Sequence, residues 1–225
     1  MMVTFDLHNH SCLSPCSCLE MDPESIAGLA AARHVDVLGI SDHNSALNSP
    51  AFALACARRG IVPFFGIELN PIEEAHLLVL FPDPLTALAF SDRVQGLLPP
   101  VSLDAEKMGD QVVVDAEGGI AALPEIWLGS ALERSFDALA QDGARSGALV
   151  VPAHVDRPVM SVCSQLGFLP AGSYDAVEAV GSSPETSLTG GYCVISGSDA
   201  HVPVHVGRRI STIEVPQDRF ERLQK

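Results

Sequence analysis

The chain has 225 residues, of which 47% are hydrophobic and 18% are charged, so it can bury the core of one α/β domain or of two smaller ones. A formal net charge of −15 argues against a basic surface for nucleic acid or anionic membranes. No apolar run is long enough to span a bilayer and no secretory signal is visible, which favours a cytoplasmic protein.

Residues 3–7 are mostly apolar and partly β-branched, which predicts a short buried strand near the N-terminus. His8 and His10 follow it. In extended backbone, residues two apart point to the same side, so the two imidazoles can bind one metal ion. Alone, such a pair is more typical of ordinary polar residues at a strand end, so the metal hypothesis requires ligands from elsewhere in the chain.

The next part of the chain alternates between helices and strands. We predict helices at 22–34 and 50–59, and strands at 35–41 and 61–67. Asp22 fits the N-cap of the first helix, His34 ends that helix in a structural role, and Gly60 stops the second helix. Polar residues follow both strands: Asp42 and His43 after the first, and Glu68 after the second. The alternation predicts a parallel sheet or barrel.

This regular alternation ends after Glu68. Only residues 69–75 separate it from the next apolar strand, 76–81, whereas a parallel crossover requires about a dozen residues. We therefore predict an antiparallel fourth strand, which places His76 beside Glu68.

The remainder is predicted as one domain, 1–225, with an insertion or flap at 99–128 that contains a small hairpin near 112–120. We predict helices at 84–98, 130–144 and 217–225, and strands at 148–153, 175–180, 194–196 and 210–215. His154 ends the first of these strands, and Asp199 and His201 follow the third.

Six cysteines are present: Cys12, Cys16, Cys18, Cys56, Cys163 and Cys193. The spacing of the first three does not match the cysteine pairs of zinc sites. We expect reduced thiols in a tight loop beside the histidines, without disulfides.

Polar residues at the predicted strand ends form one group: His8, His10, Asp42, His43, Glu68, His76, His154, Asp199 and His201. In an α/β barrel the carboxyl ends of the strands converge, so these side chains would meet in one cleft. Imidazole with carboxylate suits zinc, manganese or iron. The donors exceed the needs of one tetrahedral ion, which predicts two or three divalent ions, with Glu68 and Asp199 as natural bridges.

Several short motifs resemble, in order along nearly the whole chain, those of the PHP (polymerase and histidinol phosphatase) superfamily. They are His8-Asn9-His10-Ser11, Ser41-Asp42-His43, Gly66-Ile67-Glu68, His76-Leu77-Leu78, Ala153-His154 and Ser198-Asp199-Ala200-His201. The resemblance implies a distorted TIM-like (β/α)7 barrel that holds up to three metal ions. This superfamily hydrolyses phosphate esters and also occurs as a domain of bacterial DNA polymerases.

The resemblance also implies roles for individual residues. His8, His10, Glu68 and Asp199 would hold the first metal, Glu68, His76 and His154 the second, and His43 and His201 the third. Asp42 would support the site from behind. Pro15 stands where the family usually has an aspartate or histidine for the third metal and cannot bind it. Glu20 is our preferred substitute, and Cys16, a soft zinc ligand, is the second choice.

The predicted function is hydrolysis of a phosphate ester by a metal-activated water. The substrate would be a small phosphorylated molecule, such as a nucleotide or a sugar or amino-alcohol phosphate, and nucleic acid is disfavoured except as a short strand or a mononucleotide. Arg157 would bind the phosphate, and Arg208 and Arg209 are weaker candidates. His205 is either a proton donor to the leaving group or a residue of the rim.

Two alternatives remain open. The first is a non-catalytic metal-binding PHP module that serves a partner protein. The second is an amidohydrolase, whose barrel also begins with His-x-His but typically uses a lysine on a middle strand. The two lysines, Lys107 and Lys225, lie at no convincing strand end, so this alternative ranks last.

Overall fold

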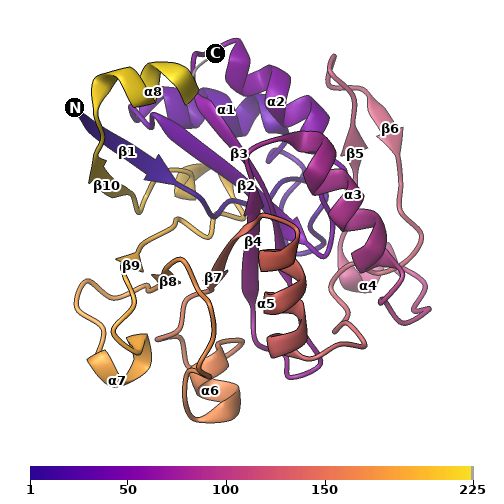
Figure 1. Cartoon of the computed structure of the whole chain (residues 1–225). Helices are drawn as coiled ribbons and strands as arrows, with labels where there is room; N and C mark the ends of the chain where they lie inside the picture. The colour runs from indigo at the N-terminus through magenta and orange to yellow at the C-terminus, as the bar shows by residue number, and fades with distance from the viewer. Residues whose placement is uncertain (224–225) are drawn as a thin grey trace.

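The computed structural model of the protein describes residues 1–223 and shows one main curled sheet with helices packed on it (Figure 1). The sheet has six strands in the order β10-β1-β2-β3-β4-β7. Their bounds are β1 Met2–Asp6, β2 Val37–His43, β3 Val62–Leu69, β4 Leu77–Phe81, β7 Leu149–Pro152 and β10 Ser211–Glu214.

Strand direction follows the length of each connection. β1, β2 and β3 are parallel, and helices α1 (Pro23–Ala32) and α2 (Ser49–Ala57) form the two crossovers. β4 is antiparallel to β3 and β7 is antiparallel to β4. The short loop after β3 therefore reverses the chain as predicted.

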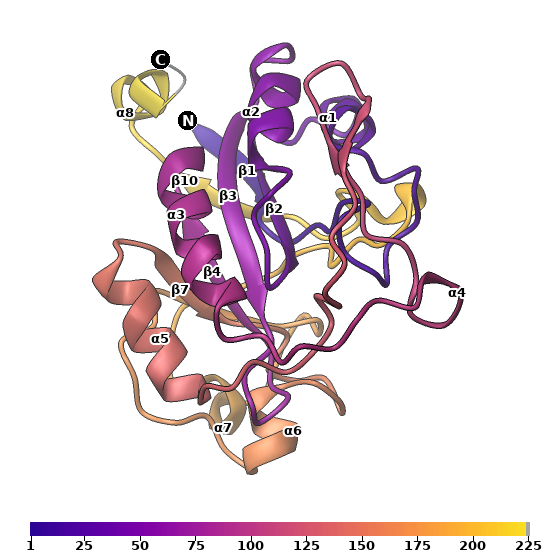
Figure 2. The same ribbon diagram turned by 90° about the vertical axis from the view of Figure 1, so that its right-hand side faces the viewer.

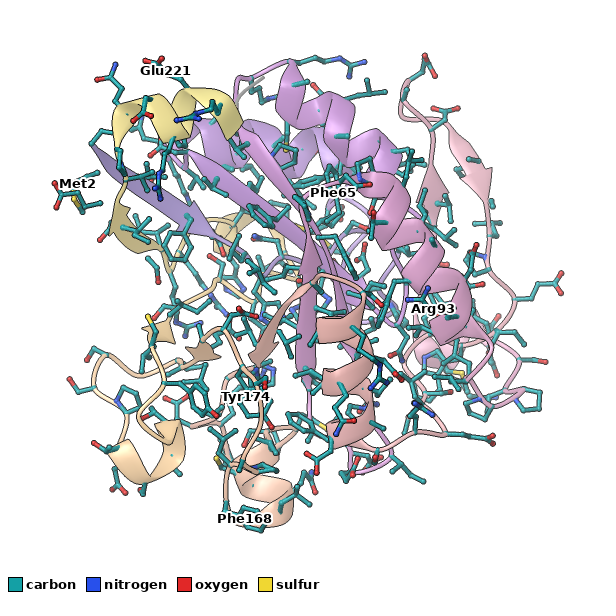
Figure 3. The ribbon with its side chains drawn as sticks, viewed as in Figure 1. Met2, Phe65, Arg93, Phe168, Tyr174 and Glu221 are labelled. Carbon is teal, nitrogen blue, oxygen red and sulfur yellow. The ribbon has the colours of Figure 1, made fainter. Side chains whose placement is uncertain are left out.

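Helices cover the outer face of the sheet (Figures 1 and 2). The helices α1, α2, α3 (Pro84–Gln95) and α5 (Phe136–Arg145) pack on it through one continuous apolar core. Phe65 of β3 lies in this core, whereas Phe168 is at the surface (Figure 3). Leu78 and Leu80 alternate with core residues along β4 and face a second apolar cluster, as the two-residue period of a strand requires.

The other face is covered differently. Phe220 of α8 (Gln217–Leu223) packs into the second cluster. Two short parallel strands, β8 (Val177–Glu178) and β9 (Val194–Ile195), form a separate small sheet. Backbone hydrogen bonds join it to β7 through Asp175 N–H and Val150 O, and to the end of β1 through Asp199 N–H and His8 O.

The observed fold is thus mixed α/β with a curled, half-barrel sheet, and the predicted distorted (β/α)7 barrel is not confirmed. Two features break the regular alternation. No helix connects β3 to β4, and only the four-residue helix α7 (Thr186–Thr189) lies between β8 and β9. The strands predicted at 175–180 and 194–196 are only two residues long each.

The helix predicted at 130–144 was wrong at its start. Ser135 caps α5, which begins at Phe136. Leu132 is buried but belongs to an irregular segment, because its amide donates a hydrogen bond to Asn70 O. The final helix runs to Leu223, and residues 224–225 of the predicted helix lie outside the described residues.

The segment 99–128 contains α4 (Ala105–Met108) and an antiparallel hairpin of β5 (Val113–Val114) and β6 (Ile120–Ala122). The remaining short helices are α6 (Val162–Leu166) and a 3-10 turn, η1 (Pro203–His205). Within residues 1–223, none of the helices combines the length and the apolar character needed to cross a bilayer.

Candidate metal centre

Eight predicted ligands lie at the carboxyl ends of strands or in the adjoining loops, and they form one connected group. His8 and His10 follow β1, His43 ends β2, Glu68 lies in β3, His76 precedes β4, His154 follows β7, and Asp199 and His201 follow β9. His43 and Glu68 lie within their strands and the other donors lie in segments next to a strand, so the sheet strands position the donors.

Glu68 is the centre of this group. Its Oε1 lies 3.3 Å from His8 Nε2, 2.8 Å from His76 Nδ1 and 3.1 Å from His154 Nε2. Its Oε2 lies 3.2 Å from His10 Nε2 and 3.2 Å from His43 Nδ1. Five imidazoles therefore surround one buried carboxylate.

The donor atoms fit metal ions better than they fit one another. Glu68 Oε2 and His76 Nδ1 are buried and lack a hydrogen-bond partner, although nitrogen or oxygen atoms lie near both. His8 Nε2 and His10 Nε2 are 3.2 Å apart. Zinc–nitrogen bonds of about 2.0–2.1 Å place two tetrahedral ligands about 3.3 Å apart, so this separation suits a shared ion.

Three sets of donors have ligand atoms that all lie within 4.8 Å of one another. They are His8, His10 and Glu68; His43, Glu68 and His76; and His10, Cys16, His43 and His201. Asp199 Oδ1 borders the first set, 3.5 Å from His8 Nε2 and 3.4 Å from His10 Nε2. The structure thus places these residues together, and His43 belongs both to the set with Glu68 and His76 and to the set with His201.

The charges within the centre are strongly coupled. Burial alone would raise the pKa of Glu68, but the imidazoles of His76, His8 and His43 hold it well below its usual range. Burial opposes protonation of His10, yet Asp199 and Glu68 raise its pKa to about 9. Divalent ions must therefore displace protons from histidines when they bind.

The pKa values of His201 and His43 are instead lowered. Burial, and then the charge of His10, lower the pKa of His201 to about 4. Burial likewise holds the pKa of His43 well below its usual range. These two imidazoles are therefore neutral near pH 7, which is the form that binds metals.

Glu178 supports the centre, and the sequence analysis missed it. The carboxylate is buried, lies 2.9 Å from His8 Nδ1 through Oε2, and accepts a hydrogen bond from the amide of His154. A Cβ on Gly197 would lie 2.2 Å from Glu178 Oε1, so glycine leaves the space that the carboxylate occupies. The available signal was a glutamate inside the predicted strand at 175–180.

Asp42 lies behind His10, in the supporting position expected of it. Its Oδ1 accepts from the Ser11 amide and the Ser14 hydroxyl, and Oδ2 accepts from the Ser11 hydroxyl. Ser14 Oγ in turn lies 3.0 Å from His10 Nδ1 and accepts from the amide of His43. Through Ser14, Asp42 therefore orients the imidazole of His10 and holds the backbone of His43.

Other predicted site residues lie at different distances from the centre. Arg157 Nη1 is 2.7 Å from Asp199 Oδ2, at the open side of the group. Arg208 donates to Ser198 O, and the amide of Arg209 donates to Ser198 Oγ, so both stabilise the loop that carries Asp199. His205 is half-buried in η1 and belongs to none of the three donor sets.

The structure does not bring Glu20 to the histidines. Its side chain is exposed and faces Cys18, and it joins none of the donor sets found among residues 1–223. Cys16, the second choice from the sequence, is the residue that lies beside His10, His43 and His201. The six cysteines are all free.

Comparisons with known proteins agree with this geometry. The model of the PHP domain family matches residues 6–112. No curated protein matches the chain.

Several solved structures share the fold. The lesion-specific endonuclease PfuEndoQ from Pyrococcus furiosus matches with a TM-score of 0.69 and 20% identity over 100% of this chain, which spans only 55% of that chain. A protein assigned as a metal-dependent phosphoesterase from Bifidobacterium adolescentis has a TM-score of 0.56 and 17% identity, over 88% of this chain and 87% of that chain. An amidohydrolase from Chromobacterium violaceum has a TM-score of 0.55 and 18% identity, over 97% and 96%.

Proposed function

Because this chain belongs to the PHP domain family, we propose that it is a metal-dependent phosphoesterase that hydrolyses a phosphate ester of a small molecule. The observation that carries the proposal is the buried carboxylate of Glu68, which is surrounded by five imidazoles and retains an oxygen without a hydrogen-bond partner. Such an arrangement is unfavourable for a protein that binds no cation there, because the buried polar atoms stay unsatisfied.

The donor set suits two or three divalent ions of zinc, manganese or iron, held by His8, His10, His43, Glu68, His76, His154, Asp199 and His201. When bound, the ions would lower the pKa of a water molecule and neutralise the oxygens of the phosphoryl group. Glu68 and Asp199 supply the negative charge that holds them. Glu178 and Ser14 fix the ring orientations of His8 and His10.

Arg157 is proposed to bind the substrate phosphate. Its side chain is 34% exposed and its guanidinium already pairs with the carboxylate of Asp199, so it lies beside the proposed ligands and is accessible to a substrate. A planar guanidinium can donate two parallel hydrogen bonds to phosphate oxygens. His205 remains the proposed proton donor or rim residue, on the turn that follows His201.

A small substrate fits the charge of the chain. The net charge is −15, and the arginines near Asp199 are few: Arg157, Arg208 and Arg209. A long nucleic acid requires many phosphate contacts, whereas one phosphate requires only the ions and an arginine. The likeness to PfuEndoQ over the whole of this chain nevertheless keeps a phosphodiester in DNA as the second candidate.

The finer fold prediction belongs with this proposal. We propose that β8 and β9 complete the curled sheet as the two remaining strands of a distorted seven-stranded barrel, with β10 outside the barrel. The bridge between Asn9 and Ala200 and the bond from Val155 N–H to Glu178 O support this arrangement. We also propose a cytoplasmic location, on the basis of the sequence alone.

A hydrolysis screen tests the proposed function. The protein is stripped with a chelator, reloaded with manganese or zinc, and assayed on phosphomonoesters, phosphodiesters, an amide panel and a short abasic DNA duplex, with elemental analysis alongside. We expect metal-dependent release of phosphate from a small monoester or diester. Metal binding without hydrolysis of any substrate would indicate the non-catalytic module, and cleavage only of amides would indicate the amidohydrolase.

A further inference from the structure

The loop after β1 places one cysteine among three histidines. Cys16 Sγ and one nitrogen each of His10, His43 and His201 lie within 4.8 Å of one another. The rings of His10 and His201 are stacked with centroids 4.1 Å apart. This set contains sulfur, whereas the two sets around Glu68 contain only nitrogen and oxygen donors.

Hydrogen bonds hold this loop against the chain that carries His201. The amide of Cys18 and the hydroxyl of Ser17 both donate to His201 O, at 3.0 and 3.2 Å. The amide of Ser17 also donates to Ser14 O, which closes a turn with Cys16 near its tip. The position of Cys16 is therefore fixed by backbone contacts.

A second segment supports the turn from outside. Gly109, next to α4, has a φ of +89° and lies so close to Pro15 that a Cβ would be 1.9 Å from its carbonyl oxygen. A glycine is required both by this contact and by the backbone conformation. The segment 99–128 thus fixes Pro15, and with it the residue that follows.

We propose that Cys16 binds a thiophilic divalent cation, zinc in the first instance, together with His43 and His201 and beside His10. This inference rests on the metal centre of the proposed function but not on hydrolytic activity. His10 and His43 are each shared with a set around Glu68, so Cys16 and His201 are the two ligands that belong to this set alone. Three protein ligands leave a coordination position open, which is the arrangement of catalytic zinc sites.

The proposal makes a statement about metal preference. Thiolate with imidazole favours zinc, whereas oxygen-rich sites accept manganese. We therefore expect the cation at Cys16 to be the one that discriminates between the two metals. The sets around Glu68 would accept either.

The other cysteines provide matched controls. Cys18 lies two residues away but faces Glu20, and Cys193 is exposed on the distant end of β9. Neither belongs to a donor set found among the described residues. Replacing them removes a thiol without removing a ligand.

Cobalt substitution of the whole chain tests the proposal directly, because a cobalt–thiolate bond produces a charge-transfer absorption in the near ultraviolet. We expect this band in the unmodified protein and in Cys18→Ser and Cys193→Ser, and its loss in Cys16→Ser. Zinc should also protect Cys16, but not Cys193, from alkylation. Elemental analysis should show that Cys16→Ser lacks one equivalent of zinc and binds manganese as before.

A second variant is used in case the serine introduced in Cys16→Ser acts as a weak metal ligand in place of the thiol. Gly109→Ala keeps Cys16 but displaces Pro15, so it should weaken the cobalt band while thermal unfolding shows a folded protein. A band that persists in Cys16→Ser, or an unmodified protein with no band, overturns the proposal. A normal band in a protein without phosphoesterase activity instead overturns the proposed function alone.

Discussion

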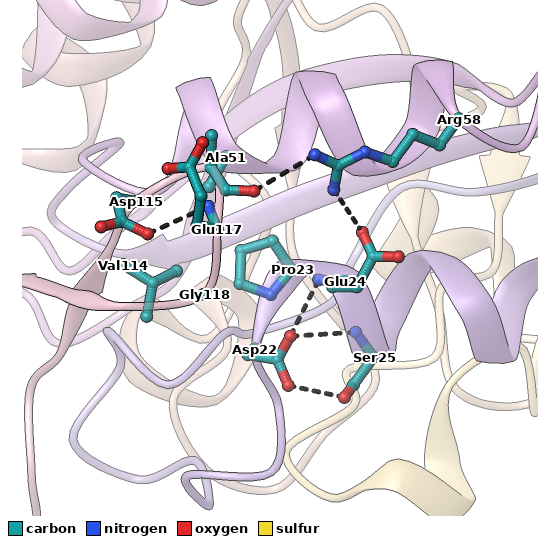
Figure 4. A pocket seen from close by; sticks show the side chains of 11 residues that line it. Asp22, Pro23, Glu24, Ser25, Ala51, Arg58, Val114, Asp115, Glu117 and Gly118 are labelled. Atoms are coloured by element: carbon teal, nitrogen blue, oxygen red, sulfur yellow. Dashed lines mark hydrogen bonds and ion pairs between the residues drawn. The ribbon is translucent and has the colours of Figure 1, made fainter.

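Two regions of the described chain that bring carboxylates together differ in what those carboxylates contact. The first is the metal centre around Glu68. The second is the pocket between α1 and the hairpin of β5 and β6, which is lined by Asp22, Glu24, Asp115 and Glu117 (Figure 4).

In the pocket of Figure 4, three of the acidic groups already have partners. Asp22 accepts from the amides of Glu24 and Ser25, and so caps α1. Glu24 pairs with Arg58, which also donates to Ala116 O. Asp115 accepts from the amides of Glu117 and Gly119.

In the metal centre, by contrast, buried carboxylates face imidazoles, and Glu68 Oε2 has no hydrogen-bond partner. Acidic composition alone therefore does not indicate a cation site. Buried donor atoms that converge and lack hydrogen-bond partners do indicate a cation site.

The largest expected effect comes from removing a ligand of the centre. His8→Ala and Asp199→Ala should each lose bound metal and phosphoesterase activity, by more than the roughly 10–100-fold that loss of a supporting residue causes. Glu24→Gln in the pocket is the matched control and should change neither. Elemental analysis and the hydrolysis assay measure the outcome, and full activity in metal-stripped protein or in either variant would reject the mechanism.

Glu178→Gln should have the next largest effect. The amide keeps the shape of the carboxylate but loses the negative charge beside His8 Nδ1, so metal affinity should fall about 10–100-fold. A competition titration with a chelating dye measures the affinity. Glu185→Gln, an exposed carboxylate before α7, is the control, and equal affinities for the two variants would show that Glu178 has no role in positioning His8.

The stability of the metal-stripped protein should depend on pH in both directions. His10 has a pKa of about 9 in the folded state and about 6.5 when unfolded, so its contribution is complete below pH 6.5 and is lost as pH rises to 9. His201 has a folded pKa of about 4, so stability is lost as pH falls from 6.5 to 4. Each of these two histidines contributes at most about 3 kcal/mol to the free energy of unfolding.

Urea unfolding between pH 4 and 9 measures this dependence. In zinc-loaded protein the decline in stability at alkaline pH should disappear, since His10 is then neutral in the folded state as well. A metal-stripped protein whose stability does not decline above pH 6.5 would contradict the assignment of a proton to His10.

The smallest expected effect lies in the pocket. Asp22→Ala removes the cap of α1 and should lower the free energy of unfolding by about 1 kcal/mol, without a change in metal content or activity. Arg58→Ala breaks an exposed ion pair and should cost about 0.5 kcal/mol or less. Loss of metal in either variant would show that the pocket and the metal centre are coupled, which contradicts the expected independence of the two regions.

The sequence predicted those parts of the centre that depend on strand geometry. His8 and His10 converge because residues two apart in an extended chain share a side, and His76 meets Glu68 because a short loop forces an antiparallel strand. Both rules are local, so they can be applied without knowing the rest of the fold.

The sequence could not predict contacts that depend on how an irregular loop turns. Glu20 and Cys16 were both candidates, and only the bonds from Ser17 and Cys18 to His201 O determine that Cys16 faces the histidines. Glu178 lies 170 residues from His8 in a two-residue strand, so no pattern in its neighbourhood indicates its partner. The wrong start of α5 has the same cause, since Leu132 bonds to Asn70 across the fold.

The hydrogen bond between the amide of Asp199 and His8 O joins two segments that lie far apart in the sequence. During synthesis on the ribosome, the histidines that follow β1 emerge long before their carboxylate partner Asp199 and the loop that carries His201. A cation at this centre could therefore be enclosed only once that later segment has emerged, and until then His8 and His10 would lack part of their donor set. Metal loading would thus follow the synthesis of the segment that carries Asp199 and His201.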